Sequence, residues 1–276
     1  MQLGEPSPEI APEVWARVQA RLDAIETRHG VSILHAVESG SRAWGFPSPD
    51  SDFDVRFIYR HPTDWYLSVF EDRDVIEEGI DDLGMDMSGW DVRKALRLLL
   101  KSNPPLYEWL TAPIVYRSDT AFARRVRALC ERLFERKTLA YHYRSIALNQ
   151  RRELGHDLVK LKKYFYAIRP LAAVAWLRAN PEGIPPMNLA SLLAGIDVPA
   201  PVRAAIEALL ARKRETSELG TAPPIAVVEE WISAQLSEAE AYCLNLPSAA
   251  PARAAVDVFF RELLALGGTK PGMDSR

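Results

Sequence analysis

The spacing of apolar residues along the first 118 positions predicts alternating helices and strands. Val14, Val18, Leu22 and Ile25 recur at helical spacing and predict a helix over residues 9–29. The stretch VSILHAVESG, residues 31–40, is apolar on both faces, which predicts a strand inside a sheet. The stretches DFDVRFIYR, DVIEEG and LGMDMSG predict three further strands. This half of the chain therefore has a mixed α/β pattern.

After residue 118 the strand pattern nearly disappears and helical spacing takes over. Six helices are predicted, over residues 119–136, 138–154, 157–179, 199–215, 224–241 and 252–266. Pro170 is expected to kink the third of these helices or to mark its first turn. The fold class predicted is α+β, with a small mixed sheet and its helices in a domain 1–118 and an all-helical domain 119–276.

Composition and charge exclude several classes of protein. Hydrophobic residues make up 48% of the 276 positions and charged residues 26%, which is typical of a soluble globular protein. The formal net charge of -3 gives no general reason for a polyanionic partner, so a nucleic-acid binder would need a local basic patch. The two cysteines, Cys130 and Cys243, lie far apart and predict neither a disulfide framework nor a zinc site.

No segment of the sequence has the pattern of a membrane or export signal. The first residues lack a basic stretch followed by an apolar core, so we expect no signal peptide. No apolar run is long enough to span a bilayer. We therefore expect a cytoplasmic protein without a membrane partner.

Two aspartates within the strand 52–60 are the strongest chemical signal. Because side chains alternate along a strand, Asp52, Asp54 and Arg56 should share one face. Carboxylates this close together repel each other unless a cation compensates them. Mg²⁺ prefers hard oxygen ligands and keeps substrate phosphates in its shell, and two such ions can clamp both oxygens of an in-line displacement. We therefore expect two Mg²⁺ ions here, with Mn²⁺ as the alternative.

The preceding Gly40-Ser41 pair fits phosphate chemistry. A glycine at a strand-to-helix turn lets the backbone approach a ligand closely. The N–H groups that open the following short helix, expected at residues 42–46, favour an anion, and the serine hydroxyl adds one more donor. Gly40 and Ser41 are therefore expected to bind the phosphates of a nucleotide.

The stretch GSRAWGFPSPDSDFDV resembles the signature of the DNA polymerase β nucleotidyltransferase superfamily. The words GWDVRKALRLLLKSNPPLYEWL and KKYFYAIRPLAAVAWL resemble a narrower group, the predicted bacterial nucleotidyltransferases of the RlaP type, which are linked to RNA repair. The resemblance extends from about residue 33 to residue 178. It implies a nucleotidyltransferase fold, although that fold also has inactive members.

The resemblance also implies a third acidic ligand from a later strand, for which Asp86 and Asp91 compete. Asp86 is the one polar residue between Met85 and Met87 in an apolar strand, and a carboxylate there needs a partner. Asp91 opens a helix that Ser88 is expected to cap, and an acidic residue at its third position has a structural explanation. We therefore choose Asp86, which could also help to deprotonate the attacking hydroxyl.

Basic side chains that could bind nucleotide phosphates are expected on the helix 157–179. Lys162, Tyr166 and Arg169 follow one another at helical spacing beside the core stripe, and Lys163 lies further round. We assign Lys162, Lys163 and Arg169 to nucleotide binding, with Arg42 and Arg56 as further candidates because they flank the main motif.

The predicted function is metal-dependent transfer of a nucleoside monophosphate from an NTP, with ATP favoured, to an acceptor hydroxyl. The acceptor is an RNA end, a protein or a small molecule. The alternatives are a catalytically inactive nucleotide-binding module of the same fold and a metal-dependent phosphohydrolase.

Overall fold

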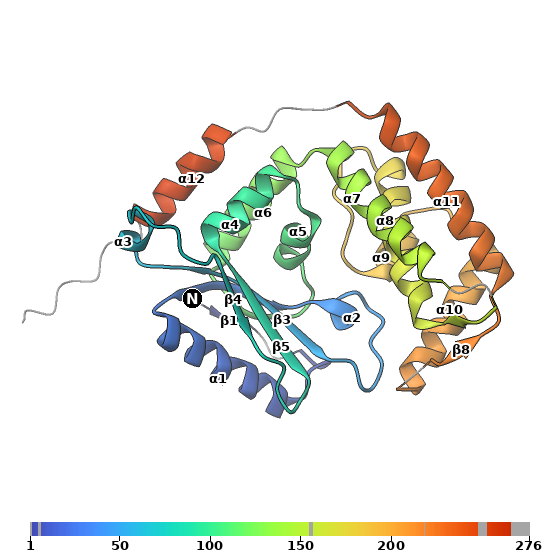
Figure 1. The fold of residues 1–276 in the computed structure, drawn as a ribbon, viewed down its shortest axis with the longest axis horizontal. Helices are drawn as coiled ribbons and strands as arrows, with labels where there is room; N and C mark the ends of the chain where they lie inside the picture. Colours follow the sequence, from blue (N-terminus) through green and yellow to red (C-terminus); the bar gives the residue numbers. More distant parts are fainter. Residues whose placement is uncertain (1, 5–6, 155–156, 218, 248–252, 266–276) are drawn as a thin grey trace, which may run out of the picture.

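The structure, a computed structural model, describes residues 2–4, 7–154, 157–217, 219–247 and 253–265. These residues form one mixed sheet with helices on both of its faces and a further group of helices beside the sheet (Figure 1). This arrangement is the α+β class predicted from the sequence. None of the helices in the described ranges is both long and apolar enough to cross a bilayer.

The sheet consists, within the described residues, of six strands in the order β1–β6–β2–β3–β5–β4. They are β1 (Gln2–Leu3), β2 (Ser32–Glu38), β3 (Phe53–Arg60), β4 (Val75–Glu78), β5 (Met85–Asp91) and β6 (Val115–Ser118). β3 is antiparallel to β2 and parallel to β5, so β3 and β5 begin at the same end of the sheet. The pattern predicts β2 to β5 but not β1, which has only two residues, and not β6.

Alternation along the central strands divides the sheet into two packed faces. Val55 and Phe57 of β3 pack with Val18 and Leu22 of α1 (Pro12–His29), which covers one face. The other face carries Ile58 and is covered by α4, α5, α6 and α12 (Figure 1). These helices are α4 (Val92–Leu100), α5 (Pro104–Leu110), α6 (Thr120–Leu133) and α12 (Arg253–Ala265).

A separate hydrophobic cluster joins the helices that lie beside the sheet. They are α7 (Arg136–Arg152), α8 (Lys162–Ala179), α9 (Leu189–Ala194), α10 (Ala200–Glu215) and α11 (Ala226–Asn245). Phe46, which follows the short helix α2 (Gly40–Ala43), belongs to the same cluster and stacks on Phe165 of α8 with ring centroids 5.0 Å apart. The segment after the Gly-Ser pair is therefore fixed to the helical part of the molecule.

Several predicted elements differ from the observed ones. The helix predicted over 157–179 begins only at Lys162, because Val159–Lys160 forms a strand, β7, that pairs with β8 (Thr221–Ala222). Pro170 lies inside α8 and does not mark its first turn. The short helix after the Gly-Ser pair begins at Gly40 and not at residue 42. The pattern also does not predict α3 (Thr63–Tyr66), α5 and α9, which are short helices of four to seven residues.

Side-chain packing does not follow the predicted boundary at residue 118. α6 and α12 come after this residue, yet they share one hydrophobic cluster with α4 and α5. Arg60 of β3 also donates to the carbonyl oxygen of Leu263 in α12, at 3.1 Å. The division into domains 1–118 and 119–276 stays a prediction.

Candidate active site

The Gly-Ser turn lies where β2 ends beside the start of β3. The backbone N–H of Ser39 donates to the carbonyl oxygen of Asp54 at 2.8 Å, which holds the turn against β3. Gly40 has φ of 57°, a conformation that favours glycine. A Cβ atom at Gly40 would lie 1.8 Å from Oδ2 of Asp54, so a side chain at this position would displace that carboxylate. Glycine is therefore required both by the backbone and by the neighbouring acid.

Asp54 and Asp86 are direct partners in the parallel pairing of β3 with β5. Nη2 of Arg56 donates to Oδ1 of Asp54 at 2.9 Å and to Oδ2 of Asp86 at 2.7 Å. Burial raises the pKa of Asp54; the Arg56 guanidinium lowers it, and the charges of Asp86 and Asp52 raise it further. These three carboxylates and one guanidinium form what we call the acidic cluster.

Asp52 lies just before β3 and is more exposed than Asp54. Its Oδ1 would be 2.8 Å from a Cβ atom at Gly84, so it lies against the turn that leads into β5. Strand β3 begins at Phe53, one residue later than the strand predicted over residues 52–60.

Glu38 is a buried acid that the motif analysis does not single out. It is fully buried at the end of β2, where Oε1 accepts from the backbone N–H of Asp54 at 2.9 Å. Oε2 accepts from the hydroxyl of Tyr116 at 2.7 Å. Burial raises the pKa of Glu38 to about 7. The signal that would have revealed it is the one used for Asp86, a single charge in an apolar strand.

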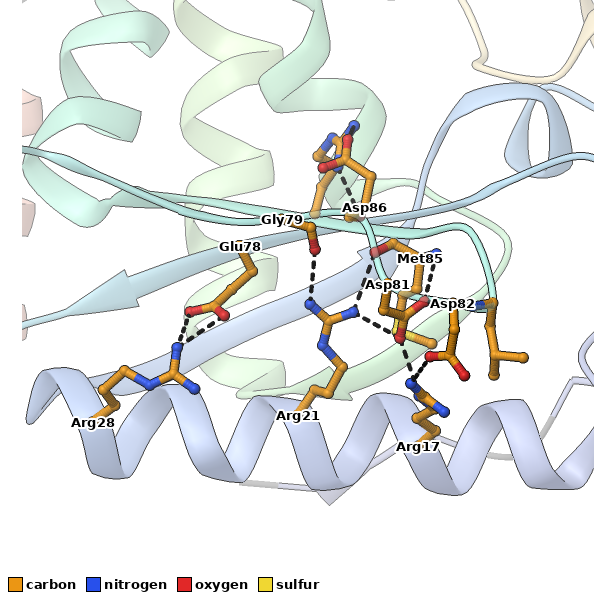
Figure 2. A network of polar contacts seen from close by, with 11 residues as sticks. Arg17, Arg21, Arg28, Glu78, Gly79, Asp81, Asp82, Met85 and Asp86 are labelled. Atoms are coloured by element: carbon orange, nitrogen blue, oxygen red, sulfur yellow. Dashed lines mark hydrogen bonds and ion pairs between the residues drawn. The ribbon is translucent and has the colours of Figure 1, made fainter.

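Arginines of α1 fix the β4–β5 hairpin that carries Asp86 (Figure 2). Arg21 donates to the carbonyl oxygens of Met85 and Gly79, both at 3.2 Å, and Arg17 binds Asp81 at 3.0 Å. Asp86 itself lies on the opposite side of the sheet from these contacts (Figure 2). Its carboxylate accepts from Nη2 of Arg56. The network therefore sets the position of Asp86 without occupying its carboxylate.

Asp91, the alternative third acid, has a structural role at the far end of β5. It is fully buried and caps α4, since its Oδ1 accepts from the backbone N–H of Arg93 at 2.8 Å. Its Oδ2 accepts from the hydroxyl of Tyr66 at 2.7 Å. The capping residue is thus Asp91 itself and not Ser88, which lies within β5. Both carboxylate oxygens of Asp91 therefore accept hydrogen bonds from structural partners, whereas Asp86 belongs to the acidic cluster.

A cleft of about 590 Å³ lies over Asp52 and Asp54. One wall comes from the first part of the chain and includes Gly40, Ser41 and Arg56. The opposite wall comes from β7, α8, α10 and β8 and includes Lys160, Lys162, Tyr166, Lys213 and Thr221. An acidic cluster thus faces a row of lysines across one cleft.

Lys213 is the residue of this wall that the sequence pattern does not predict. It is only 6% exposed, and its Nζ lies 4.7 Å from the ring centroid of Phe46. Burial and the neighbouring charge of Lys162 lower its pKa to about 8. None of the described carboxylates forms an ion pair with it. A buried lysine without a carboxylate partner is suited to an anionic ligand.

Three of the predicted phosphate-binding residues do not line the cleft. Arg169 is buried, binds Glu108 and donates to the carbonyl oxygen of Met187 at 3.0 Å. Lys163 binds Glu153 at the surface. Arg42 donates to the carbonyl oxygen of Ser51 at 2.7 Å and stacks on Phe53. Helical spacing does not tell which neighbours a face meets, and the assignment of these three residues to nucleotide binding stays a prediction.

The acidic cluster offers donor atoms of the type that divalent cations bind. Carboxylate oxygens are the ligands that Mg²⁺ prefers. The described residues contain no set of three His, Cys, Asp or Glu side chains that converge on one point. Arg56 instead lies between Asp54 and Asp86. The chemistry of the donors therefore fits a cation, but the carboxylates do not converge on a preformed metal site in this structure.

The Gly-Ser turn, the paired acids on neighbouring strands and the mixed sheet are those of a DNA polymerase β-like nucleotidyltransferase. The family model described as "RlaP: RNA repair pathway DNA polymerase beta family" matches residues 14–262. The chain therefore belongs to the RlaP family, which confirms the resemblance seen in the sequence.

A curated relative extends this similarity over most of the chain. The uncharacterized protein YcgL of Bacillus subtilis (strain 168) is 45% identical over 221 residues, which cover 80% of this chain and 84% of that protein. A solved nucleotidyltransferase-like protein from Exiguobacterium sibiricum 255-15 is 11% identical, with a TM-score of 0.29. That similarity covers 93% of this chain and 82% of the solved one.

Proposed function

We propose that the protein transfers a nucleoside monophosphate from an NTP to an acceptor hydroxyl and releases pyrophosphate. The observation that carries this proposal is the pairing of Asp54 with Asp86 beside a cleft whose opposite wall holds Lys162 and Lys213. Acids for metal and lysines for phosphate, facing each other across one cleft, suit a metal–triphosphate substrate. Family membership supports the same class of reaction.

The acidic cluster, the Gly-Ser turn and two lysines each have a role in this proposal. Asp52, Asp54 and Asp86 would hold Mg²⁺, two ions in all or Mn²⁺ in their place, which supplies charge stabilisation at the transferred phosphate. Gly40 and Ser41 would bind the β- and γ-phosphates from one wall, and Lys162 and Lys213 from the other. Arg56 would move away from Asp54 and Asp86 when the cation binds, since both need the same carboxylate oxygens.

The reaction itself is an in-line displacement. The acceptor oxygen forms a bond to the α-phosphorus while the bond from that phosphorus to the bridging oxygen breaks and pyrophosphate leaves. Asp86, which lies at the edge of the cluster, is the candidate to accept the proton of the attacking hydroxyl.

The acceptor is proposed from the family alone. The family is described by an RNA repair pathway, which favours an RNA end over a protein or a small molecule. ATP is the first nucleotide to test.

The decisive experiment incubates the protein with Mg²⁺, each of four labelled NTPs and a panel of acceptors that includes RNA ends and proteins. Label transferred to an acceptor, and absent with Asp54→Asn, supports the proposal. Release of inorganic phosphate identifies a phosphohydrolase instead. Binding of NTP without either product identifies an inactive binding module, to which the bridging position of Arg56 would then be suited.

A further inference from the structure

A smaller cavity adjoins the cleft and has two lining residues in common with it. Its volume is about 120 Å³, and Trp44 and Tyr166 line both spaces. Their rings meet edge to face with centroids 6.1 Å apart. Burial raises the pKa of Tyr166, and the charges of Asp54 and Asp52 raise it further, so Tyr166 lies close enough to interact with the acidic cluster. The small cavity therefore lies within reach of the proposed site of transfer.

The size of the cavity restricts its occupant to about one ring. An apolar cavity of roughly 150 Å³ can hold benzene. The volume of about 120 Å³ here is somewhat smaller, so it accepts at most a single six-membered ring and not a ribose with phosphates. The larger cleft, at about 590 Å³, has room for those groups.

Aromatic and aliphatic side chains form most of the cavity wall. Phe165, Pro105 and Ile146 line it, and Phe46 stacks on Phe165 at 5.0 Å between centroids. Flat rings with apolar edges accept a planar heterocycle, because every nucleobase has a face that stacks.

The polar groups of this wall suit an uncharged ligand. The charged side chains that line it, Glu108 and Arg169, bind each other, and Tyr143 also donates to Glu108 at 3.1 Å. His142 lines the cavity, forms no hydrogen bond with another described residue and has its pKa lowered by burial, which keeps it neutral. A neutral imidazole, which carries one donor and one acceptor, fits the edge of a nucleobase and not a phosphate.

We propose that this cavity, bounded by Trp44, Tyr166, His142 and Ile146, receives the six-membered ring of the base of the incoming NTP. The triphosphate then lies in the cleft between the Gly-Ser turn and Lys213. This inference rests on the proposed function, because it assigns the base of the nucleotide whose phosphates that function places.

The test compares ligands with and without a base. Isothermal titration calorimetry in the presence of Mg²⁺ gives the affinities of ATP, UTP and inorganic tripolyphosphate for the wild type and three variants. Ile146→Trp adds a large ring at the wall of the cavity, and His142→Phe keeps a ring but removes its nitrogens. Ser145→Trp is the matched control, since Ser145 is exposed on the same helix and lines neither cavity.

We expect the wild type to bind ATP and UTP at least about tenfold more tightly than tripolyphosphate, since base stacking adds affinity. Ile146→Trp should remove most of this difference and leave tripolyphosphate binding unchanged. His142→Phe should weaken both nucleotides by a smaller factor, and Ser145→Trp should alter nothing. If Ile146→Trp also weakens the binding of tripolyphosphate, the nucleotide affinities of His142→Phe decide whether the cavity binds the base.

Two results would overturn the inference, and they differ in what they imply for the proposed function. Equal affinity of the wild type for nucleotides and tripolyphosphate, or nucleotide binding unaffected by both cavity variants, rejects the base site while leaving the function intact. Failure of the wild type to bind any of the three ligands rejects both.

Discussion

Asp54 and Asp86 lie directly opposite each other on two parallel strands, and a single nitrogen of Arg56 binds both carboxylates. The two acids come from positions 32 residues apart in the chain, which shows how the parallel pairing of β3 and β5 assembles the cluster. Arg56 comes from β3 itself, so the cation that compensates the acids in this structure is part of the same strand.

The relationship between Asp86 and Asp91 gives the first prediction. Asp86→Ala should lower transfer by at least about 100-fold, since even outer partners of a metal site change activity by 10–100-fold. Asp91→Ala should retain transfer but lower the free energy of unfolding by about 1 kcal/mol or more, because α4 loses its cap. Turnover with labelled NTP and thermal melting of both variants measure the two effects. The reverse pattern would make Asp91 the functional acid.

Removal of the Arg56 guanidinium should make the acidic cluster a better cation site in the absence of nucleotide. In Arg56→Met, Asp54 and Asp86 lose the charge that now compensates them. We expect Mg²⁺ or Mn²⁺ to raise the melting temperature of this variant more than that of the wild type. Arg97→Met is the control, because Arg97 is exposed and binds Glu71 away from the cluster. An identical response of all three proteins to the cation would contradict a metal role for these carboxylates.

Two glycines with positive φ separate backbone strain from the effect on the site. Gly40 and Gly30 have φ of 57° and 61°, so an alanine at either position should cost about 1–2 kcal/mol of stability. A Cβ atom at Gly40 would collide with Asp54, whereas one at Gly30 would have no atom within 4 Å. We therefore expect Gly40→Ala to abolish transfer and Gly30→Ala to retain it at a temperature where both are folded. Comparable activity of the two variants would show that Asp54 can be displaced without consequence.

Lys213 predicts how polyphosphate binding depends on pH. Its pKa is lowered to about 8, so the free protein carries this charge below pH 8 and loses it above. A bound anion favours the charged form, and binding above pH 8 must take up a proton. The affinity for tripolyphosphate should therefore fall as the pH rises through 8.

The variant Lys213→Met isolates this contribution. Its affinity below pH 8 should be about tenfold weaker than that of the wild type, the size expected for one contact with a charged group. The difference in tripolyphosphate affinity between wild type and variant should become smaller as the pH rises. Calorimetry at several pH values measures this difference. A difference that stays constant over the whole range would exclude Lys213 as the titrating group.

The local pattern of the sequence determined the elements that carry the acids and the turn beside them. Strand β3 follows from alternation, and the Gly-Ser pair predicts the strand-to-helix turn that the structure contains between β2 and α2. The preference for Asp86 over Asp91 rests on the cost of an unpartnered carboxylate in an apolar strand, and this local argument agrees with where the two side chains lie. Such inferences work because each depends on neighbours that are close in the chain.

Only the tertiary structure decided which basic groups reach the cleft. Lys162 and Arg169 belong to one predicted stripe, yet Lys162 lines the cleft and Arg169 is buried against Glu108. Lys213 reaches the same wall from α10, through contacts with Phe46 and Phe165 that no local pattern encodes. Helical spacing fixes which residues share a face, but the packing of that face against distant segments decides whether it meets a ligand or a partner side chain.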